Sequence, residues 1–242
     1  MKIAVLTDAH ANLPALEAAL AAIRAEGCQA IYHTGDAIGI GPQPAECLDL
    51  LLGTPGLRCL MGNHDAWFAF GLPEPRPAWM SEGELAHHRW VHARLDPALR
   101  PVVAAWPWVL EEELAGLPVS FLHYALAPSG TDFADLVAEP TTGDLDRLFA
   151  PCRGRLVFYG HHHAASDLAG RARYVSPGAL GCSTEPVARF AILDVGRGGR
   201  YTVEHRAAPY DDVGLFQAFE ERDVPEREAI YRMFFGGRWP SP

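Results

Sequence analysis

Short polar motifs follow apolar runs at five places in this chain, and this repeated order constrains the fold more than any other feature. The motifs are Asp8-Ala-His10, Gly35-Asp36, Gly62-Asn63-His64-Asp65, His123 and Gly160-His161-His162-His163. Each apolar run has the length of a buried strand, and open α/β sheets place their sites just beyond the carboxyl ends of strands. The pattern therefore predicts a sheet whose strand ends deliver polar side chains to one shared site.

The first part of the chain alternates between strand and helix patterns. Residues 3–6, 30–33 and 57–61 are apolar runs typical of strands. Between them, one helix is predicted from Pro14 until Gly27 ends it, and another over residues 45–52. Alternation of this kind predicts βαβ units and a parallel sheet.

The pattern changes between residues 66 and 108. Prolines interrupt this segment, a helix is predicted over 82–94, and five of the six tryptophans fall within it. We interpret 66–108 as a cap inserted into a single domain that covers residues 1–242. A β-hairpin is predicted at 109–123, and the chain ends in a predicted helical tail, residues 209–242.

Composition excludes several classes of protein. With 242 residues and a net charge of −10, the surface repels nucleic acid and anionic membranes, which argues against either as a partner. The cysteines are scattered without CxxC spacing, as in proteins with reduced thiols. The first apolar run is too short for a signal peptide, and no run approaches about 18 apolar residues. We therefore expect a cytoplasmic protein.

The residue types in the motifs are those of a two-metal centre. Asp8 and His10, one residue apart, point the same way if the stretch is extended, and can hold one ion together. Asp36 has two oxygens and can bridge two ions, while Asn63 offers a neutral carbonyl oxygen. Mixed nitrogen and oxygen donors favour manganese, iron, zinc or nickel over magnesium. A pair of ions about 3.5–4 Å apart activates water against a phosphate ester.

Each motif has a plainer interpretation when taken alone. An isolated Asp-x-His seldom binds a metal, a single histidine such as His123 is commonly a core residue, and Gly-Asn-His-Asp is typical of a turn. The occurrence of all five motifs in this order, each at a strand end, is what predicts the metal centre.

The motif set resembles that of the calcineurin-like metallophosphoesterase superfamily over about the first 195 residues. Residues 9–17 and 35–42 are similar to the branch that includes YfcE-type phosphodiesterases and diadenosine-tetraphosphate hydrolases. The resemblance implies an α/β fold, a four-layer αββα sandwich of two mixed β-sheets flanked by helices. It also implies two divalent ions, with manganese first among manganese, iron, zinc and nickel.

The resemblance also implies a role for each site residue. One ion is expected between Asp8, His10, Asp36 and His163, and the other between Asp36, Asn63, His123 and His161, with Asp36 shared. His64 is expected to face the substrate, where it stabilises the transition state or protonates the leaving oxygen. Asp65 is expected either to orient His64 or to cap a helix or turn.

The function that these observations predict is hydrolysis of a small phosphodiester, phosphomonoester or nucleotide by a hydroxide that bridges the two ions. A non-catalytic scaffold on the same fold and a nuclease are the alternatives. His88 and His92, spaced i, i+4, are interpreted as a solvated helix face. Most tryptophans of the 66–108 segment are expected in its own core, with one or two, such as Trp67, at the cleft. The oligomeric state is left open.

Overall fold

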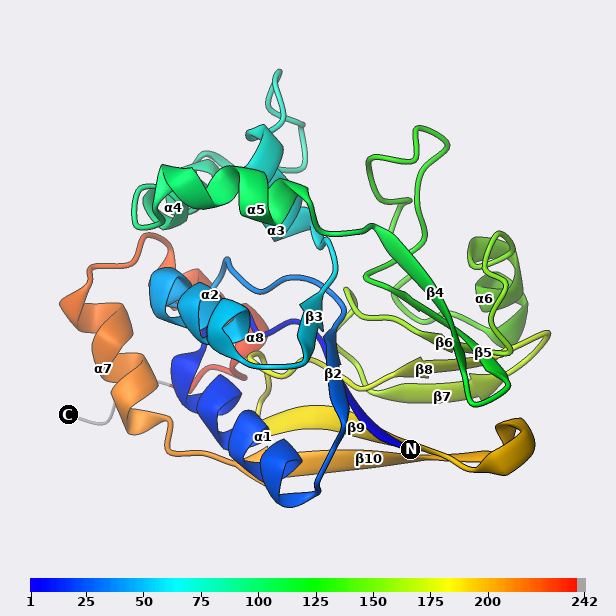
Figure 1. Cartoon of the computed structure of the whole chain (residues 1–242). Coiled ribbons are helices and arrows are strands. Elements are labelled where there is room, and N and C mark those ends of the chain that lie inside the picture. Colours follow the sequence, from blue (N-terminus) through cyan, green and yellow to red (C-terminus); the bar gives the residue numbers. More distant parts are fainter. Residues whose placement is uncertain (239–242) are drawn as a thin grey trace.

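The structure, a computed structural model, describes residues 1–238 and consists of two facing five-stranded sheets (Figure 1). The first sheet has the order β10-β9-β1-β2-β3 and the second the order β4-β5-β6-β8-β7. Both sheets mix parallel and antiparallel pairs. The strands are β1 (Lys2–Leu6), β2 (Ala30–His33), β3 (Leu57–Cys59), β4 (Val109–Leu114), β5 (Leu117–Leu122), β6 (Leu156–Phe158), β7 (Ser166–Ala169), β8 (Arg173–Ser176), β9 (Val187–Val195) and β10 (Tyr201–Pro209).

Helices α1 (Leu13–Ala25) and α2 (Pro44–Gly53) cover the outer face of the first sheet. Helix α1 begins where the sequence predicts, because the Asn12 side chain accepts a hydrogen bond from the Ala15 N–H at 3.1 Å and Pro14 occupies the first turn. Its apolar face contacts β9 and β10 and shares a buried cluster with β1, which runs parallel to β2. The predicted βαβ units are therefore present.

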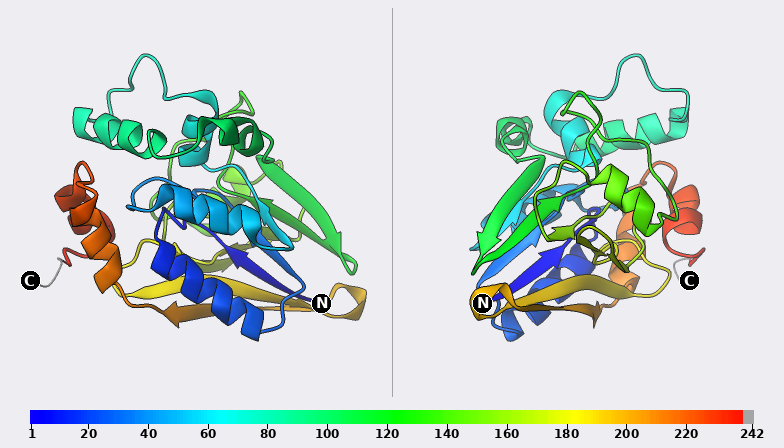
Figure 2. Two further views of the ribbon diagram at one scale, coloured as in Figure 1. Left: turned by 60° about the vertical axis from the view of Figure 1, so that its left-hand side comes forward. Right: turned by 90° about the vertical axis from the view of Figure 1, so that its right-hand side faces the viewer.

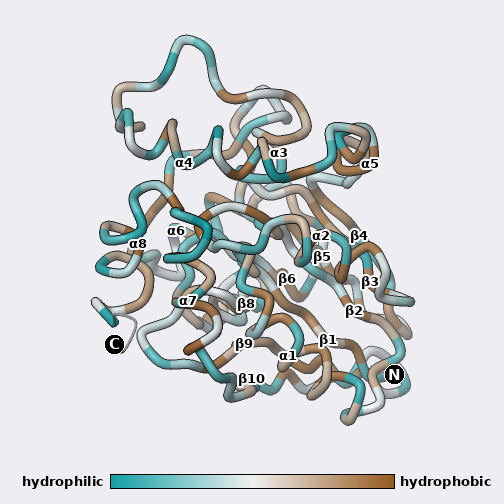
Figure 3. The backbone as a smooth tube through the Cα atoms, turned by 90° about the vertical axis from the view of Figure 1, so that its left-hand side faces the viewer, coloured by the Kyte–Doolittle hydropathy of each residue, from teal (hydrophilic) through white to brown (hydrophobic). Residues whose placement is uncertain are grey.

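The inner faces of the two sheets pack against each other. Ile3 and Val5 of β1 share one buried cluster with Phe121 of β5 and Phe158 of β6, and hydrophobic residues concentrate on these strands (Figure 3). Helix α6 (Thr142–Leu148) covers the outer face of the second sheet. The resulting order of helix, sheet, sheet and helix confirms the predicted αββα sandwich.

The 66–108 segment lies above α2 at one end of the sandwich (Figure 2). It contains most of α3 (Asn63–Phe70), then α4 (Glu82–His92), the short 3₁₀ turn η1 (Pro97–Leu99) and α5 (Arg100–Ala104). Its buried side chains, among them Phe68, Val91 and Trp106, belong to the same cluster as the outer face of the first sheet. The segment is thus packed onto the main core.

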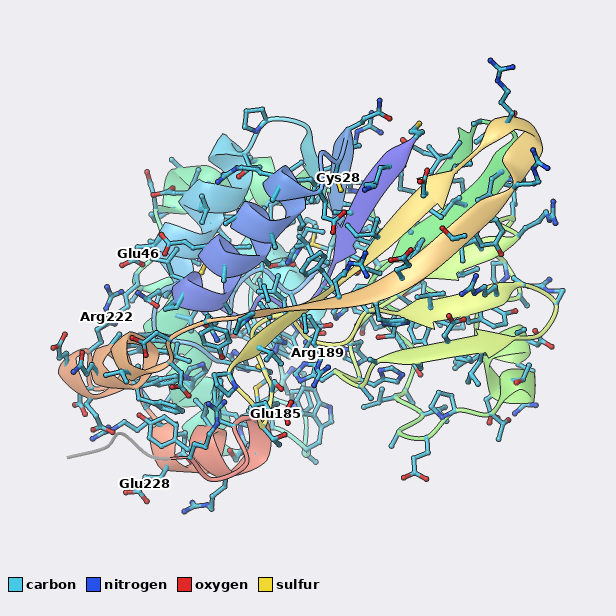
Figure 4. The ribbon with its side chains drawn as sticks, turned by 90° about the horizontal axis from the view of Figure 1, so that it is seen from below. Cys28, Glu46, Glu185, Arg189, Arg222 and Glu228 are labelled. Atoms are coloured by element: carbon cyan, nitrogen blue, oxygen red, sulfur yellow. The ribbon has the colours of Figure 1, made fainter. Side chains whose placement is uncertain are left out.

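The tail folds back beside α1 and α2. Helices α7 (Val213–Glu221) and α8 (Arg227–Phe234) form a third apolar cluster. Arg222, directly after α7, forms an ion pair with Glu46 of α2 at 2.6 Å (Figure 4). Residues 239–242 of the predicted tail lie outside the described residues. Within residues 1–238, no helix has both the length and the apolar character needed to cross a bilayer.

Candidate metal centre

All the predicted ligands lie at strand ends, and the fold brings them together. Asp8 and His10 follow β1, Asp36 follows β2, and Asn63 follows β3 at the start of α3. From the second sheet, one histidine follows β5 and two follow β6. Five of the seven belong to groups whose ligand atoms lie within 4.8 Å of one another. Asp8 lies 3.6 Å from two members of these groups, and Asn63 is hydrogen-bonded to a third. The seven residues are Asp8, His10, Asp36, Asn63, His123, His161 and His163.

The backbone at these positions is unusual. Asp8, His10, Asp36, His161 and His163 all have φ between 45° and 75°, in the left-handed region. Side chains other than glycine rarely adopt this region, and each such residue costs about 1–3 kcal/mol. Asp8 and His10 therefore lie on a tight turn rather than in the extended stretch that we predicted, and this turn still aims both side chains at one place. Strain concentrated on candidate ligands indicates that a functional requirement maintains it.

Four residues define the first position, here called site one: Asp8, His10, Asp36 and His163. The Nε2 atoms of His10 and His163 are 2.9 Å apart, and each is 3.6 Å from Oδ1 of Asp8. Oδ2 of Asp36 is 3.8 Å from His10 Nε2. Nitrogen and oxygen atoms converge here at separations that suit ligands of one ion.

Four residues define the second position, here called site two: Asp36, Asn63, His123 and His161. His123 Nε2 is 3.2 Å from Oδ1 of Asn63 and 3.3 Å from Oδ2 of Asp36. His161 joins the group formed by Asp36 and His123. The same oxygen of Asp36 thus faces both positions, as expected of a bridging ligand.

Backbone groups fix the orientation of these side chains. Nδ1 of His123 is 3.0 Å from the Thr34 carbonyl oxygen and donates its proton there, so Nε2 is the ring nitrogen that a metal ion could take. The other oxygen of Asp36 accepts a hydrogen bond from the His64 N–H at 3.0 Å, in the first turn of α3. A Cβ on Gly62 would lie 2.2 Å from that Asp36 oxygen, so the motif needs glycine.

The electrostatics of the centre favour cations. Burial alone would raise the pKa of Asp8 and Asp36, but the surrounding imidazoles outweigh burial and hold both values well below the usual range. Burial lowers the pKa of His161 and His163 to about 4, so both rings are neutral at pH 7. Burial also lowers the pKa of His123, but the nearby Asp36 carboxylate outweighs burial and raises the pKa of His123 to about 9. The carboxylates thus hold a proton on His123 when no metal competes for its position.

His64 lies at the mouth of the centre, with Nε2 3.9 Å from Oδ2 of Asp36 and 14% of its side chain exposed. Its Nδ1 is buried without a hydrogen-bond partner within the described chain. Burial lowers the pKa of His64 well below its usual value, so the neutral ring has one N–H to donate. This position, beside rather than within the two ligand groups, suits contact with a substrate.

The Asp65 carboxylate accepts hydrogen bonds from backbone N–H groups of two loops. It accepts hydrogen bonds from the N–H groups of Asp36 at 2.7 Å, Ala37 at 3.1 Å and Gly62 at 3.1 Å. The hydrogen bond from Gly62 caps α3, which is the alternative role that we considered. Asp65 fixes the loop that carries Asp36 and ties it to the start of α3.

The interpretation of His88 as part of a solvated face is wrong. His88 is 7% exposed, and its ring centroid lies 5.1 Å from that of His64. Trp67 completes the group, with its ring 5.0 Å from His64 and 4.7 Å from His88. The i, i+4 spacing gave no sign of this contact, because it arises from the packing of α4 over α3. His92 is also partly buried, against Phe68.

Other candidates take structural positions. His162 turns away from both sites and contacts Tyr159. Arg173 and Arg189, which the sequence left open as surface charges or phosphate-binding residues, form ion pairs with Asp167 and Glu185, respectively. Phe133, from the loop after β5, is a feature that the sequence analysis missed, and its ring lies 5.3 Å from that of His123.

Comparison with known proteins identifies the family of the chain. Residues 1–198 match the calcineurin-like phosphoesterase superfamily domain, and the chain belongs to this family. An uncharacterized protein of Methanocaldococcus jannaschii is 30% identical over 165 residues, which span 66% of this chain and 62% of that protein.

Two solved structures share the fold. A hypothetical protein from Pyrococcus horikoshii has a TM-score of 0.80 and 20% identity, with 98% of this chain and 99% of that chain covered. A metallophosphoesterase from Sphaerobacter thermophilus has a TM-score of 0.71 and 22% identity, with 96% and 97% covered. In both cases the similarity extends over the tail as well as the family domain.

Proposed function

We propose that the protein is a dinuclear metal-dependent phosphoesterase. The observation that carries the proposal is the position of Asp36, whose Oδ2 lies 3.8 Å from His10 Nε2 and 3.3 Å from His123 Nε2. One buried carboxylate oxygen facing two imidazole groups is the arrangement needed for two ions that share a ligand. The donor set of nitrogens and oxygens fits divalent manganese, iron, zinc or nickel, of which we place manganese first.

The protein residues have separate tasks in this proposal. Two bound divalent ions would supply an activated water and neutralise charge on the phosphoryl group. Asp8, His10 and His163 would hold one ion, and the residues of site two the other. His64 stands next to the shared carboxylate, from where its N–H reaches a phosphoryl or leaving-group oxygen. It stabilises developing charge there or passes on its proton.

We further propose that the substrate is a small phosphodiester, phosphomonoester or nucleotide in the cytoplasm. Aromatic rings border the centre on three sides: Trp67 near His64, Phe133 near His123, and Phe234 with its ring 5.6 Å from that of His163. Such rings can stack on a base or another flat group. This fits the YfcE-type and diadenosine-tetraphosphate hydrolase branch that the sequence resembles.

The complete ligand set argues against the scaffold alternative, which has no use for strained and buried ligands. The net charge of −10 argues against a nuclease.

The experiment is reconstitution of chelator-treated protein with single metals. Manganese is expected to restore hydrolysis of bis-p-nitrophenyl phosphate or p-nitrophenyl phosphate, with about two ions bound per chain. Protein that binds no metal, or that hydrolyses neither ester with manganese, nickel, cobalt or iron, would refute the proposal.

A further inference from the structure

One cysteine lies beside the candidate metal centre. The Sγ atom of Cys182 and one ring nitrogen each from His10 and His163 lie within 4.8 Å of one another. The cysteine is 6% exposed, and its thiol is free. Two members of this group belong to site one, so the thiol borders that site.

The backbone holds Cys182 against the same loops that carry the ligands. The N–H groups of Leu180 and Gly181 donate to the carbonyl oxygens of Thr7 at 3.0 Å and Asp8 at 2.9 Å. The Ala179 N–H donates to the His163 carbonyl oxygen at 2.9 Å. The cysteine is therefore placed by the segments that place three of the ligands.

The close approach of these segments depends on Gly181. A Cβ at this position would lie 1.9 Å from the carbonyl oxygen of Ala9, so any side chain would push the two loops apart. The Asn12 side chain also donates to the Gly181 carbonyl oxygen at 2.8 Å. The geometry that brings the thiol to site one is thus built from several independent contacts.

The other side of Cys182 packs against the tail. It shares an apolar cluster with Ile40, Leu215 and Phe216, so this flank of site one excludes water. Cys47 and Cys59 are buried as well, but they pack in the cluster between the first sheet and its helices. Among the cysteines of residues 1–238, only Cys182 lies in a group of side chains that could hold a metal ion.

We propose that the thiolate of Cys182 is a ligand of the ion in site one, an assignment that rests on the proposed metal centre. Zinc bonds of about 2.3 Å to sulfur and about 2.0–2.1 Å to imidazole nitrogen place tetrahedral ligand atoms roughly 3.6 Å apart. The three ligand atoms, which lie within 4.8 Å of one another, must therefore draw together by up to about 1 Å when the ion binds. On binding, the thiol releases its proton to solvent and its sulfur donates an electron pair to the ion. Site one then prefers thiophilic divalent ions such as zinc, iron or cobalt over manganese. The preference for manganese proposed above then applies to site two, which keeps only nitrogen and oxygen donors.

The experiment loads full-length, chelator-treated protein with two equivalents of Co²⁺ and records its absorption spectrum. Wild-type protein is expected to show a near-ultraviolet sulfur-to-cobalt charge-transfer band. Cys182→Ser should lose this band while still binding cobalt, and Cys59→Ser, a buried cysteine outside the ligand groups, should keep it. The preference of site one for zinc over manganese should fall by about 10- to 100-fold in Cys182→Ser, the range seen when metal surroundings are altered.

X-ray absorption of zinc-loaded wild-type protein gives a test that needs no variant. A sulfur neighbour at about 2.3 Å is expected, and its absence would overturn the assignment even if Cys182→Ser does not fold. Wild-type protein that binds two ions and hydrolyses esters without any sulfur band would also overturn it, and would leave the proposed function intact. Failure to bind any metal would instead refute the metal centre, and this assignment with it.

Discussion

The loops at the strand ends and the 66–108 segment meet at His64 but are built differently. The loops carry the ligands on strained, hydrogen-bonded backbone, and Asp8 and His123 are fully buried there. The 66–108 segment holds none of the ligands, and it exposes large aromatic side chains such as Trp79, 65% exposed, and Phe70, 62% exposed. The comparison suggests a division of work, in which the loops perform the chemistry and the segment selects the substrate.

The largest effect is expected at Asp36, which belongs to the loops. Asp36→Asn removes the charge shared by both sites, so both ions should be lost and kcat/KM should fall by about 10⁴-fold or more. His163→Ala touches site one only and should mainly empty that site. Metal analysis of the purified variants measures this difference. Two full ions in Asp36→Asn would break the bridging assignment.

His64 lies between the two regions and should separate chemistry from metal binding. His64→Ala should keep its metal content while kcat falls by about 10²- to 10⁴-fold, the range for a positioned proton donor. If His64 protonates the leaving group, the loss is smaller for p-nitrophenolate, which needs no proton, than for an alkoxide. Equal losses would show that His64 stabilises charge. Unchanged activity on every ester would remove it from the site.

The grouping of the candidate ligands could be predicted from sequence because each one follows a strand in the chain. The strand ends bring these side chains together whatever the details of the loops. Asp8 and His10 therefore lie close together even though the extended local structure that we predicted for them is wrong. The roles of the 66–108 segment were harder to predict. His88 meets His64 only because α4 packs over α3, a contact between residues 24 positions apart that no local pattern records.

Among the elements that were not predicted, α3 and β7 have clear physical explanations. The start of α3 was not predicted, because Gly62-Asn63-His64-Asp65 has the composition of a turn, and only the hydrogen bonds of the Asp65 carboxylate show that it opens a helix. Strand β7 was not predicted either, because it lies at the edge of the second sheet and pairs only with β8, so its residues are half-exposed. Edge position and capping depend on neighbours that the sequence does not identify.

The division of work is sharpened by comparing two tryptophans of the 66–108 segment. Trp67→Ala should raise KM for the preferred substrate by about 5- to 100-fold, the cost of one lost stacking contact, with little change in kcat for a small generic ester. Trp106, 9% exposed in the main cluster, is the matched control. Trp106→Ala should instead destabilise the protein by about 3–5 kcal/mol. Thermal melts and kinetics are measured for both variants. If both lower the melting temperature and neither alters substrate preference, the 66–108 segment does not select the substrate.

The smallest effect, a dependence of metal affinity on pH, tests the loops alone. Burial opposes the charge on His123, but Asp36 raises its pKa to about 9, above the ordinary 6.5. The protonated ring therefore stabilises the metal-free protein fully below about pH 6.5, and this stabilisation is lost as the pH rises through about 9. An ion at site two must displace this proton, so its affinity should rise about tenfold per pH unit between pH 7 and 8, with one proton released. Calorimetry in buffers of different ionisation enthalpy counts that proton. His123→Asn should bind more weakly and release one proton fewer, and an unchanged count in this variant would show that another group carries the proton.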